Sequence, residues 1–262
     1  MQTKEIKINL NKSRSFKITV NDKYKGLLTN QVDFFNALDH LLVLKIDKKV
    51  QVGMLPSLNA ERDSLLVKKF TYDASFHKYL RKMISSRAKH LWDISLVLKK
   101  NNISISEPVL FFDDFPNNIS VFVSRFIDNS RNLGSIAKDD NSLLSKDMAE
   151  SLILELVSFH HNGFVHNDLK WSNILINNDC KVIIIDLDNV KQYKHFNKTG
   201  IKKDLIRFYR FALEVDSIKW IEDYFFPLYL NKINIDFIDD MFVRDIRKCA
   251  LQEWEKYGCR KL

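Results

Sequence analysis

The sequence predicts an α+β protein of two lobes, a sheet-rich lobe over residues 1–128 and a helix-rich lobe over residues 129–262. Short runs rich in Val, Ile and Leu, separated by polar, Gly or Pro breaks, dominate the first lobe and are typical of strands. After Ser145 the apolar residues mostly recur every three to four positions, which is typical of helices. A chain of 262 residues, 45% of them hydrophobic, is long enough for one large domain or for two modest lobes that share a core.

The pattern of the first seventy residues predicts strands. Polar or Gly/Pro/Asn breaks bound each run, and Gly53 begins a loop that reaches Asp63. The clearest strands are expected at 41–46, 49–54 and 64–70.

A helix and a hairpin should complete this lobe. Helical spacing of the apolar residues runs from about Ala74 to Lys100, and the Asn101-Asn102 pair follows as a stop. The runs 109–112 and 119–126 then predict a hairpin, with a turn within Asp113–Asn118.

The second lobe should open with a well-capped helix. Ser145 is a suitable N-cap, Asp147 lies in the first turn, and Gly163 follows the predicted end near His160. Two short strands are expected at 173–176 and 181–185, before helical periodicity continues to the C-terminus.

The charge balance favours an anionic partner. The chain has 41 Lys and Arg against 33 Asp and Glu, a net charge of +8. This excess suits a nucleotide, a nucleic acid or a phospholipid surface. Nucleic-acid binding is not expected, because the four Trp are scattered and no aromatic–basic interleaving or zinc-ligand spacing occurs.

Cysteine usage and hydropathy indicate a cytoplasmic protein. The three Cys include no CxxC pair, which argues against a disulfide scaffold or a Cys-based zinc site. The N-terminus is charged where a signal peptide is apolar, and no run approaches the roughly 18 apolar residues of a membrane span.

The residues that carry chemistry lie between the helix ending near His160 and the strands after it. They read His166-Asn-Asp-Leu-Lys-Trp-Ser-Asn-Ile-Leu-Ile176, followed further on by Ile183-Ile-Ile-Asp-Leu-Asp188. A polar turn would explain any one of these residues, but not His, Asp, Lys and Asn together at these spacings. The segment resembles the catalytic loop of the protein-kinase superfamily, H-x-D-L-K-x-x-N, which implies a two-lobed protein-kinase-like fold.

The resemblance implies a role for each residue in phosphoryl transfer from ATP. Asp168 would accept the proton of the attacking hydroxyl as catalytic base, and Lys170 would neutralise charge on the transferring group. Asn173 and Asp186 would supply oxygen ligands to Mg²⁺. His166 is expected to hold the loop by hydrogen bonding rather than to carry protons.

A kinase-like fold also needs a nucleotide-binding Lys on the third strand of its small lobe. Ser64-Leu-Leu-Val-Lys-Lys-Phe70 places Lys68 after three apolar residues, similar to the kinase V-A-I-K pattern. Lys69 should point to the opposite face of the strand.

Several features depart from the kinase pattern. No G-x-G-x-x-G is present, so another turn, around Gly53, is expected to cover the phosphates. The helix that should supply a Glu to Lys68 has none, and Asp93 is the only acid in its central part. These departures leave a catalytically inactive pseudokinase scaffold as an alternative.

Other departures point away from protein substrates. Asn167 replaces the usual Arg, and eighteen residues from Asp186 to Asp204 are too few for a peptide-binding platform. Asp188 is equally compatible with a second metal ligand and with a loop acid. Asp204 is read as an acid that opens a helix and either holds the catalytic-loop backbone or merely caps that helix.

The flanking motifs are similar to those of bacterial lipopolysaccharide core kinases, which phosphorylate heptose or 3-deoxy-D-manno-octulosonic acid (Kdo). The similarity covers roughly residues 60–212. It lies in Ser86-Arg-Ala-Lys-His-Leu-Trp92, in Leu98–Val109, in the catalytic loop and in the basic run from Lys202 to Arg210. Leu91 stands where that family has Glu.

This resemblance implies an ATP-dependent kinase of lipopolysaccharide biosynthesis, with Kdo or heptose as acceptor. The acceptor would be an anionic glycolipid or sugar at the inner membrane. The basic stretches 77–100 and 191–210 would permit peripheral contact with that surface, although a solvated basic face explains either stretch alone. A kinase of a protein or of another small-molecule alcohol remains the alternative enzyme.

Overall fold

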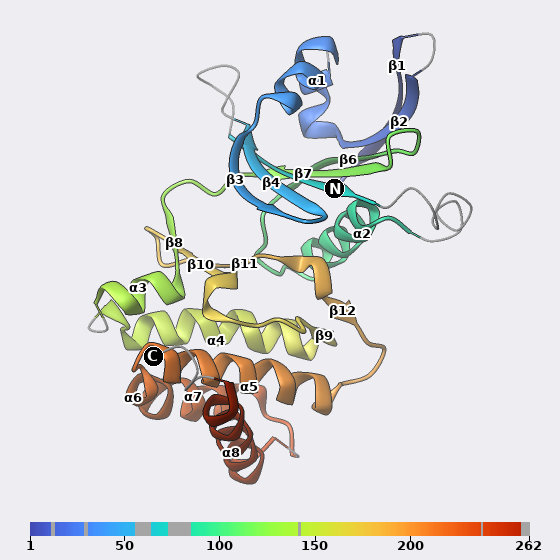
Figure 1. Cartoon of the computed structure of the whole chain (residues 1–262). Coiled ribbons are helices and arrows are strands. Elements are labelled where there is room, and N and C mark those ends of the chain that lie inside the picture. The colour runs from blue at the N-terminus through green and yellow to red at the C-terminus, as the bar shows by residue number, and fades with distance from the viewer. Residues whose placement is uncertain are drawn as a thin grey trace. The chain divides into compact units, whose positions relative to one another are not determined.

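The computed structural model describes residues 1–11, 14–28, 31–55, 64–72, 85–140, 143–236 and 238–257. The chain forms two compact units, coloured from blue to red along the chain in Figure 1. The first unit comprises Met1–Lys100 and Ser106–Asp128, and the second Asn101–Ile105 and Asn129–Leu262. The predicted α+β, two-lobed class is confirmed, while the assignment of 1–128 and 129–262 as functional lobes stays a prediction.

An antiparallel sheet forms the frame of the first unit. Its described strands follow the order β1-β2-β6-β7-β5-β4-β3. The runs predicted before and after the long helix are confirmed as β3, β4 and β5, and as the hairpin of β6 and β7. The strands are β1 (Thr3–Asn11), β2 (Arg14–Asn21), β3 (Leu42–Asp47), β4 (Val50–Leu55), β5 (Leu65–Thr71), β6 (Pro108–Asp114) and β7 (Ile119–Arg125).

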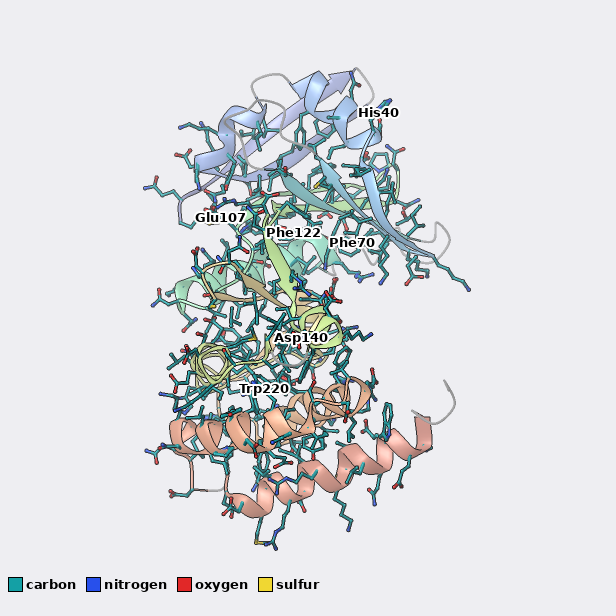
Figure 2. All side chains as sticks on the ribbon, turned by 90° about the vertical axis from the view of Figure 1, so that its left-hand side faces the viewer. His40, Phe70, Glu107, Phe122, Asp140 and Trp220 are labelled. Atoms are coloured by element: carbon teal, nitrogen blue, oxygen red, sulfur yellow. The ribbon has the colours of Figure 1, made fainter. Side chains whose placement is uncertain are left out.

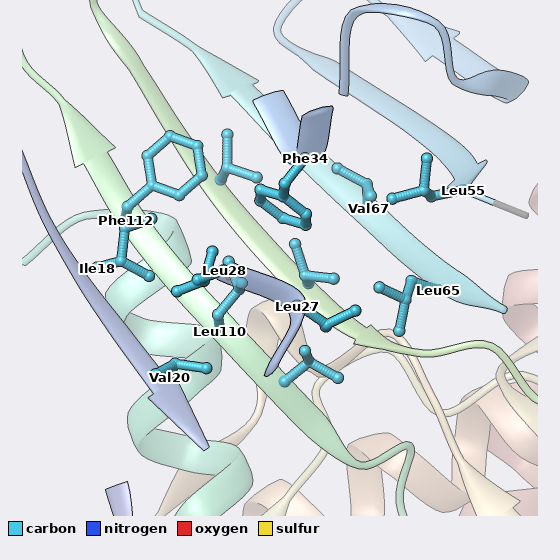
Figure 3. Close-up of a cluster of buried hydrophobic side chains, with 13 residues drawn as sticks. Ile18, Val20, Leu27, Leu28, Phe34, Leu55, Leu65, Val67, Leu110 and Phe112 are labelled. Carbon is cyan, nitrogen blue, oxygen red and sulfur yellow. The ribbon is translucent and has the colours of Figure 1, made fainter. Parts of the chain in front are cut away.

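Helical segments cover both faces of this sheet (Figure 1). On one face, α1 (Gln31–Asp39) and the 3₁₀ segment Asp22–Leu28 bury Phe34, Leu27 and Leu28 against strand residues (Figure 3). On the other face, Trp92 of α2 (Arg87–Lys100) lies 5.5 Å from the ring of Phe111.

Two expectations for the first unit were wrong. Residues 22–28 and 31–39 are helical rather than extended, because an apolar cover over the sheet stabilises them more than strand pairing would. The helix predicted from Ala74 does not run unbroken to Lys100. Its part at 74–84 lies outside the described residues, and α2 starts after Ser86, whose Oγ accepts the Lys89 N–H at 3.0 Å as an N-cap.

The second unit consists mostly of helices (Figure 1). Ser145 caps α4 by accepting the Met148 N–H at 3.1 Å, as predicted, and Gly163 follows the end of this helix. The helices are α3 (Leu133–Asp139), α4 (Lys146–His161), α5 (Lys198–Glu214), α6 (Ile218–Trp220), the π-helical turn Ile221–Phe225, α7 (Phe226–Ile233) and α8 (Asp240–Tyr257).

Short strands carry the catalytic loop in this unit. The predicted strands at 173–176 and 181–185 are confirmed as β10 and β11, which pair with each other and, through β10, with β8. The strands are β8 (Ser130–Asn132), β9 (Phe164–Val165), β10 (Ile174–Asn177), β11 (Val182–Ile184) and β12 (Lys191–Gln192). Among the described residues, no helix is both long enough and apolar enough to span a membrane.

Candidate catalytic site

The catalytic loop brings three of the predicted residues together. It leaves β9 at Val165 and ends in the 3₁₀ turn Trp171–Asn173, which leads directly into β10. Lys170 Nζ lies 3.0 Å from Asp168 Oδ2, and Asn173 Nδ2 lies 3.3 Å from the same oxygen. Both Asp168 and Lys170 are about one-third to two-fifths exposed (31% and 42%), so both side chains are accessible from solvent.

Asn173 is oriented so that its carbonyl oxygen stays available. Its Nδ2 donates to the backbone oxygen of Asp168 at 3.0 Å and also to the Asp168 carboxylate. Its own backbone oxygen accepts the Ile185 N–H at 3.0 Å, which ties the loop to the segment before Asp186. No described residue donates to Oδ1, the oxygen that a metal would need.

Asp186 follows β11 in a left-handed backbone conformation, with φ +60°. Asp tolerates this region better than most residues, and strained backbone of this kind concentrates at functional sites. Asp188 lies two residues further on, in the 3₁₀ segment Leu187–Asn189. Its two predicted roles, metal ligand and loop acid, both stay open.

The donor set fits Mg²⁺ rather than a metal held wholly by protein. Among the described residues, no group of three or more His, Cys, Asp and Glu side chains is placed to hold a metal. Mg²⁺ commonly binds one or two carboxylates together with phosphate and water oxygens. Asn173 Oδ1 and the Asp186 carboxylate are oxygen ligands of that class.

His166 holds the loop by a hydrogen bond from inside the protein. Its side chain is fully buried, and Nε2 donates to the backbone oxygen of Ile185 at 3.0 Å. Burial lowers the pKa of His166, against a smaller opposing effect of the Asp204 carboxylate. Burial thus favours the neutral imidazole, which fits the expectation that His166 holds the loop by hydrogen bonding.

Asp204 fixes the backbone at the start of the loop. Its carboxylate accepts the His166 N–H at 2.6 Å through Oδ2 and the Asn167 N–H at 2.8 Å through Oδ1. The expectation that Asp204 opens a helix is wrong, because it lies inside α5 and is fully buried. A helix-terminal acid would remain in water, whereas this carboxylate replaces water for two buried N–H groups.

Two further residues of this network were not predicted. His160 Nδ1 and the Tyr229 hydroxyl lie 2.7 Å apart, and His160 Nε2 lies 3.8 Å from Asp204 Oδ2. Burial raises the pKa of Tyr229 well above its ordinary value. The sequence shows His160 near the end of the helix that begins after Ser145. Nothing in the sequence indicates that Tyr229 and Asp204 lie beside it.

Lys68 lies in the first unit, on the sheet face that packs against α2. It is directly across from Phe122, which is in turn across from Phe111, the partner of Trp92. Side chains opposite each other in an antiparallel pair share a face. Phe70, two residues along from Lys68, lies 4.3 Å below the Arg87 guanidinium of α2, and Phe70 and Phe122 are labelled in Figure 2.

Lys69 points the other way, as predicted. It lines a small pocket with Phe35 and Asp39 of α1, on the face opposite to α2. This placement leaves Lys68 as the lysine on the α2 face of β5.

Gly53 does not form the turn that was expected to cover phosphates. It lies within β4, paired with Val43 and Val67, and a Cβ there would approach the Leu41 side chain to 2.8 Å. Close packing between strands therefore explains this glycine. The turn of the hairpin beside β5 is Lys48-Lys49, between β3 and β4.

The acid missing from α2 is not replaced within the described part of that helix. Leu91 is 1% exposed and packs in the core, whereas Asp93 faces solvent and pairs with Lys89 at 2.5 Å. Asp93 thus lies on the exposed side of α2, away from the sheet.

Comparisons with known proteins agree with this arrangement. The RIO domain model matches residues 59–211, more than half of the 262-residue chain. A protein named 3-deoxy-D-manno-octulosonic acid kinase, from Vibrio parahaemolyticus, is 32% identical over 102 residues. That match covers 38% of this chain and 42% of the relative, so the chain spans less than half of the relative's length. Both matches indicate a kinase and confirm the predicted resemblance to the Kdo-kinase type within the protein-kinase-like superfamily.

Proposed function

This chain belongs to the RIO domain family, and from that premise we propose that it transfers the γ-phosphoryl group of ATP to a sugar hydroxyl. The acceptor we propose is the inner core of lipopolysaccharide, at Kdo or heptose. The observation that carries the proposal is the arrangement around Asp168 Oδ2, with Lys170 Nζ at 3.0 Å and Asn173 Nδ2 at 3.3 Å.

The chemistry follows from these positions. Asp168 orients the acceptor hydroxyl and takes its proton as the oxygen bonds to the γ-phosphorus and the bond to the β–γ bridging oxygen breaks, releasing ADP. Lys170 offsets the charge that builds on the transferring group. Asn173 Oδ1 and Asp186 are proposed to hold Mg²⁺, which when bound neutralises phosphate charge.

A nucleotide site in the first unit is proposed around Lys68. The half-buried side chains of Val52, Met54 and Leu66 share its sheet face and offer apolar surface to a base. Lys48 and Lys49, at the tip of the adjacent hairpin, would contribute positive charge where many kinases use glycine backbone amides.

The choice of a sugar over a protein acceptor rests on three points. The relative from Vibrio parahaemolyticus is named a Kdo kinase. The chain's net charge of +8 suits an anionic acceptor. Only the 3₁₀ segment Leu187–Asn189, β12 and a few connecting residues separate Asp186 from α5 at Lys198, which leaves little chain for a peptide platform.

Peripheral contact with the inner membrane is a further part of the proposal. Acids of α8 pair with two of the basic side chains in the stretch 191–210, so other side chains must make this contact. In the stretch 191–210, Lys202 pairs with Asp245 at 2.9 Å and Arg210 with Glu253 at 3.3 Å, both acids of α8. Those two cations are partly neutralised within the protein. The exposed Lys191 and Lys203 are better placed to face an anionic surface.

A panel of acceptors tests the proposal. The full chain would be incubated with Mg²⁺ and ATP and with a Kdo-bearing lipid A precursor, a heptose-bearing core, a generic protein substrate or simple sugars. Mass spectrometry would detect added phosphate. We expect phosphate on a core acceptor alone; transfer only to protein or simple sugars would overturn the acceptor, and no transfer with any acceptor would favour a pseudokinase scaffold.

A further inference from the structure

A polar pocket lies in the second unit, between the end of α4 and the segment that connects β12 to α5. Its volume is about 340 Å³, within the range of roughly 300–1,000 Å³ typical of small-molecule sites. None of the proposed catalytic or metal-binding residues lines it. Its lining consists of His161, Asn162, Gly163, Gln192, Tyr193, Lys194, His195 and Phe196.

Several contacts fix the walls of this pocket. Gln192 pairs with Phe164 between β12 and β9, and the Tyr193 N–H donates to the Gly163 oxygen at 2.9 Å. Gly163 has φ +77°, and a Cβ there would lie 2.3 Å from the Tyr193 oxygen, so the close approach requires glycine. His161 Nε2 donates to the Ile233 oxygen at 2.7 Å, which anchors the other wall to α7.

The charge of the lining is positive. It contains Lys194, His195 and His161 and no acidic residue. Within the described part of the chain, the side chains of Lys194 and His195 make no hydrogen bond or ion pair, in contrast to Lys202 and its partner Asp245. A lysine ammonium that no protein acid neutralises favours a phosphate or carboxylate ligand, and the His195 ring adds a hydrogen-bonding group beside it.

The remaining lining suits a saccharide. Tyr193 is 38% exposed and offers both an apolar ring face and a hydroxyl. Gln192 and Asn162 add amide oxygens, because their NH₂ groups donate to the backbone oxygens of Asn162 and Ser158. A few placed polar groups with an aromatic surface are typical of sites for small polar ligands. The pocket thus combines the Lys194 ammonium, for an anionic group, with surface for a sugar ring.

We propose that this pocket binds an anionic saccharide unit of the acceptor through its phosphate or carboxylate group. The inference rests on the proposed sugar-kinase function. The chain runs from Gly163 through β9 to Asp168 in five residues, which is at most about 17 Å of extended backbone. An acceptor of several sugar units can span that distance, with its charged unit in the pocket and its reacting hydroxyl at Asp168.

The test combines steady-state kinetics with direct binding, using the full chain. The double variant Lys194→Gln/His195→Gln removes the two unengaged side chains, and Lys219→Gln, exposed at α6, serves as the matched control. We expect the acceptor KM to rise about tenfold or more, with kcat and the KM for ATP unchanged, because one charge-assisted contact is lost before chemistry. The control should match wild type.

Direct binding distinguishes recognition of a sugar phosphate from recognition of phosphate alone. Calorimetric titration with a hexose phosphate and with inorganic phosphate should show the hexose phosphate binding more tightly to wild type and losing that advantage in the double variant. An unchanged KM, equal binding of both probes, or equal binding by wild type and variant would overturn the inference. Titration needs no turnover, so it tests ligand binding in the pocket even if wild type phosphorylates no acceptor. Failure to phosphorylate any acceptor would refute the proposed function but not the binding site.

Discussion

At the scale of single residues, the catalytic loop places one cation against one carboxylate. Lys170 Nζ and Asp168 Oδ2, 3.0 Å apart and partly exposed, form an ion pair that solvent weakens. The pair therefore contributes little to stability, and under the proposed function its role is to hold a positive charge beside the transferring phosphoryl group. Asn173 holds the same carboxylate from the other side.

Replacing Lys170 tests that role. Lys170→Met keeps much of the side-chain length and removes the charge, so we expect kcat to fall about 10²–10³-fold, the range for losing one electrostatic contact in a transition state. Affinity for ATP and thermal stability should change little. Lys219→Met is the control for losing one surface lysine in the same unit. A kcat equal to that of the control would exclude Lys170 from catalysis.

Asp204 is the residue on which the loop backbone depends most. Asp204→Asn keeps the shape but turns an NH₂ group toward one of the two N–H donors, at His166 or Asn167. We expect the free energy of unfolding to fall by roughly 1.5–3 kcal/mol, the contribution of a hydrogen bond to a charged group. Urea denaturation would measure it, with the exposed Asp223→Asn as control. Equal stability of the two variants would show that this carboxylate is not structural.

At the scale of elements, α4 holds the short segment Asn101–Ile105 within the second unit. Glu155 of α4 accepts the Ser104 N–H, and the Ser104 oxygen accepts the Ile184 N–H of β11 at 2.9 Å. Ile105 forms a parallel bridge with Ile184. The strand that leads to Asp186 is thus tied to α4 through this segment.

The pH dependence of stability tests this connection. Burial raises the pKa of Glu155 above its ordinary 4.5, against opposing effects of Ser104 and Lys181. The folded state therefore binds the Glu155 proton more tightly than the unfolded state does. The contribution of this protonation to the free energy of unfolding is fully present below pH 4.5 and is lost as the pH rises through the folded pKa. Glu155→Gln keeps an acceptor but cannot ionise, so its stability relative to wild type should improve from acidic to neutral pH.

Urea unfolding of both proteins across that pH window is the measurement. Glu150→Gln, on the same helix and 45% exposed in its side chain, controls for the loss of one carboxylate. A stability difference between Glu155→Gln and wild type that stays constant with pH would contradict the raised pKa.

At the scale of the whole molecule, the sequence predicted the parts where local pattern and packing agree. The α4 cap at Ser145 and strands β3 to β7 follow from periodicity and spacing, and the loop from His166 to Asn173 follows from its resemblance to the kinase motif. The helical cover at Asp22–Leu28 and Gln31–Asp39 could not be foreseen, because only tertiary burial of Phe34 and its neighbours selects it over strand.

The same limit applies to the site. Residues adjacent in the loop could be predicted from their spacing, whereas Asp204, His160 and Tyr229 meet only through the packing of α4, α5 and α7. Gly53 was misread for a related reason. A glycine in a sequence marks either a turn or a close approach of two chains, and only the register of β3 and β4 shows which.

One rate comparison shows whether Asp168 is the catalytic base of a sugar kinase. Transfer of labelled γ-phosphoryl from ATP, with Mg²⁺, to a Kdo-bearing lipid A precursor would be measured for wild type, Asp168→Asn and the exposed-loop control Asp179→Asn. We predict that Asp168→Asn slows transfer about 10²–10⁴-fold, the usual contribution of a positioned general base, while ATP affinity and the control rate stay at wild-type values. Transfer by Asp168→Asn at the wild-type rate would contradict the account.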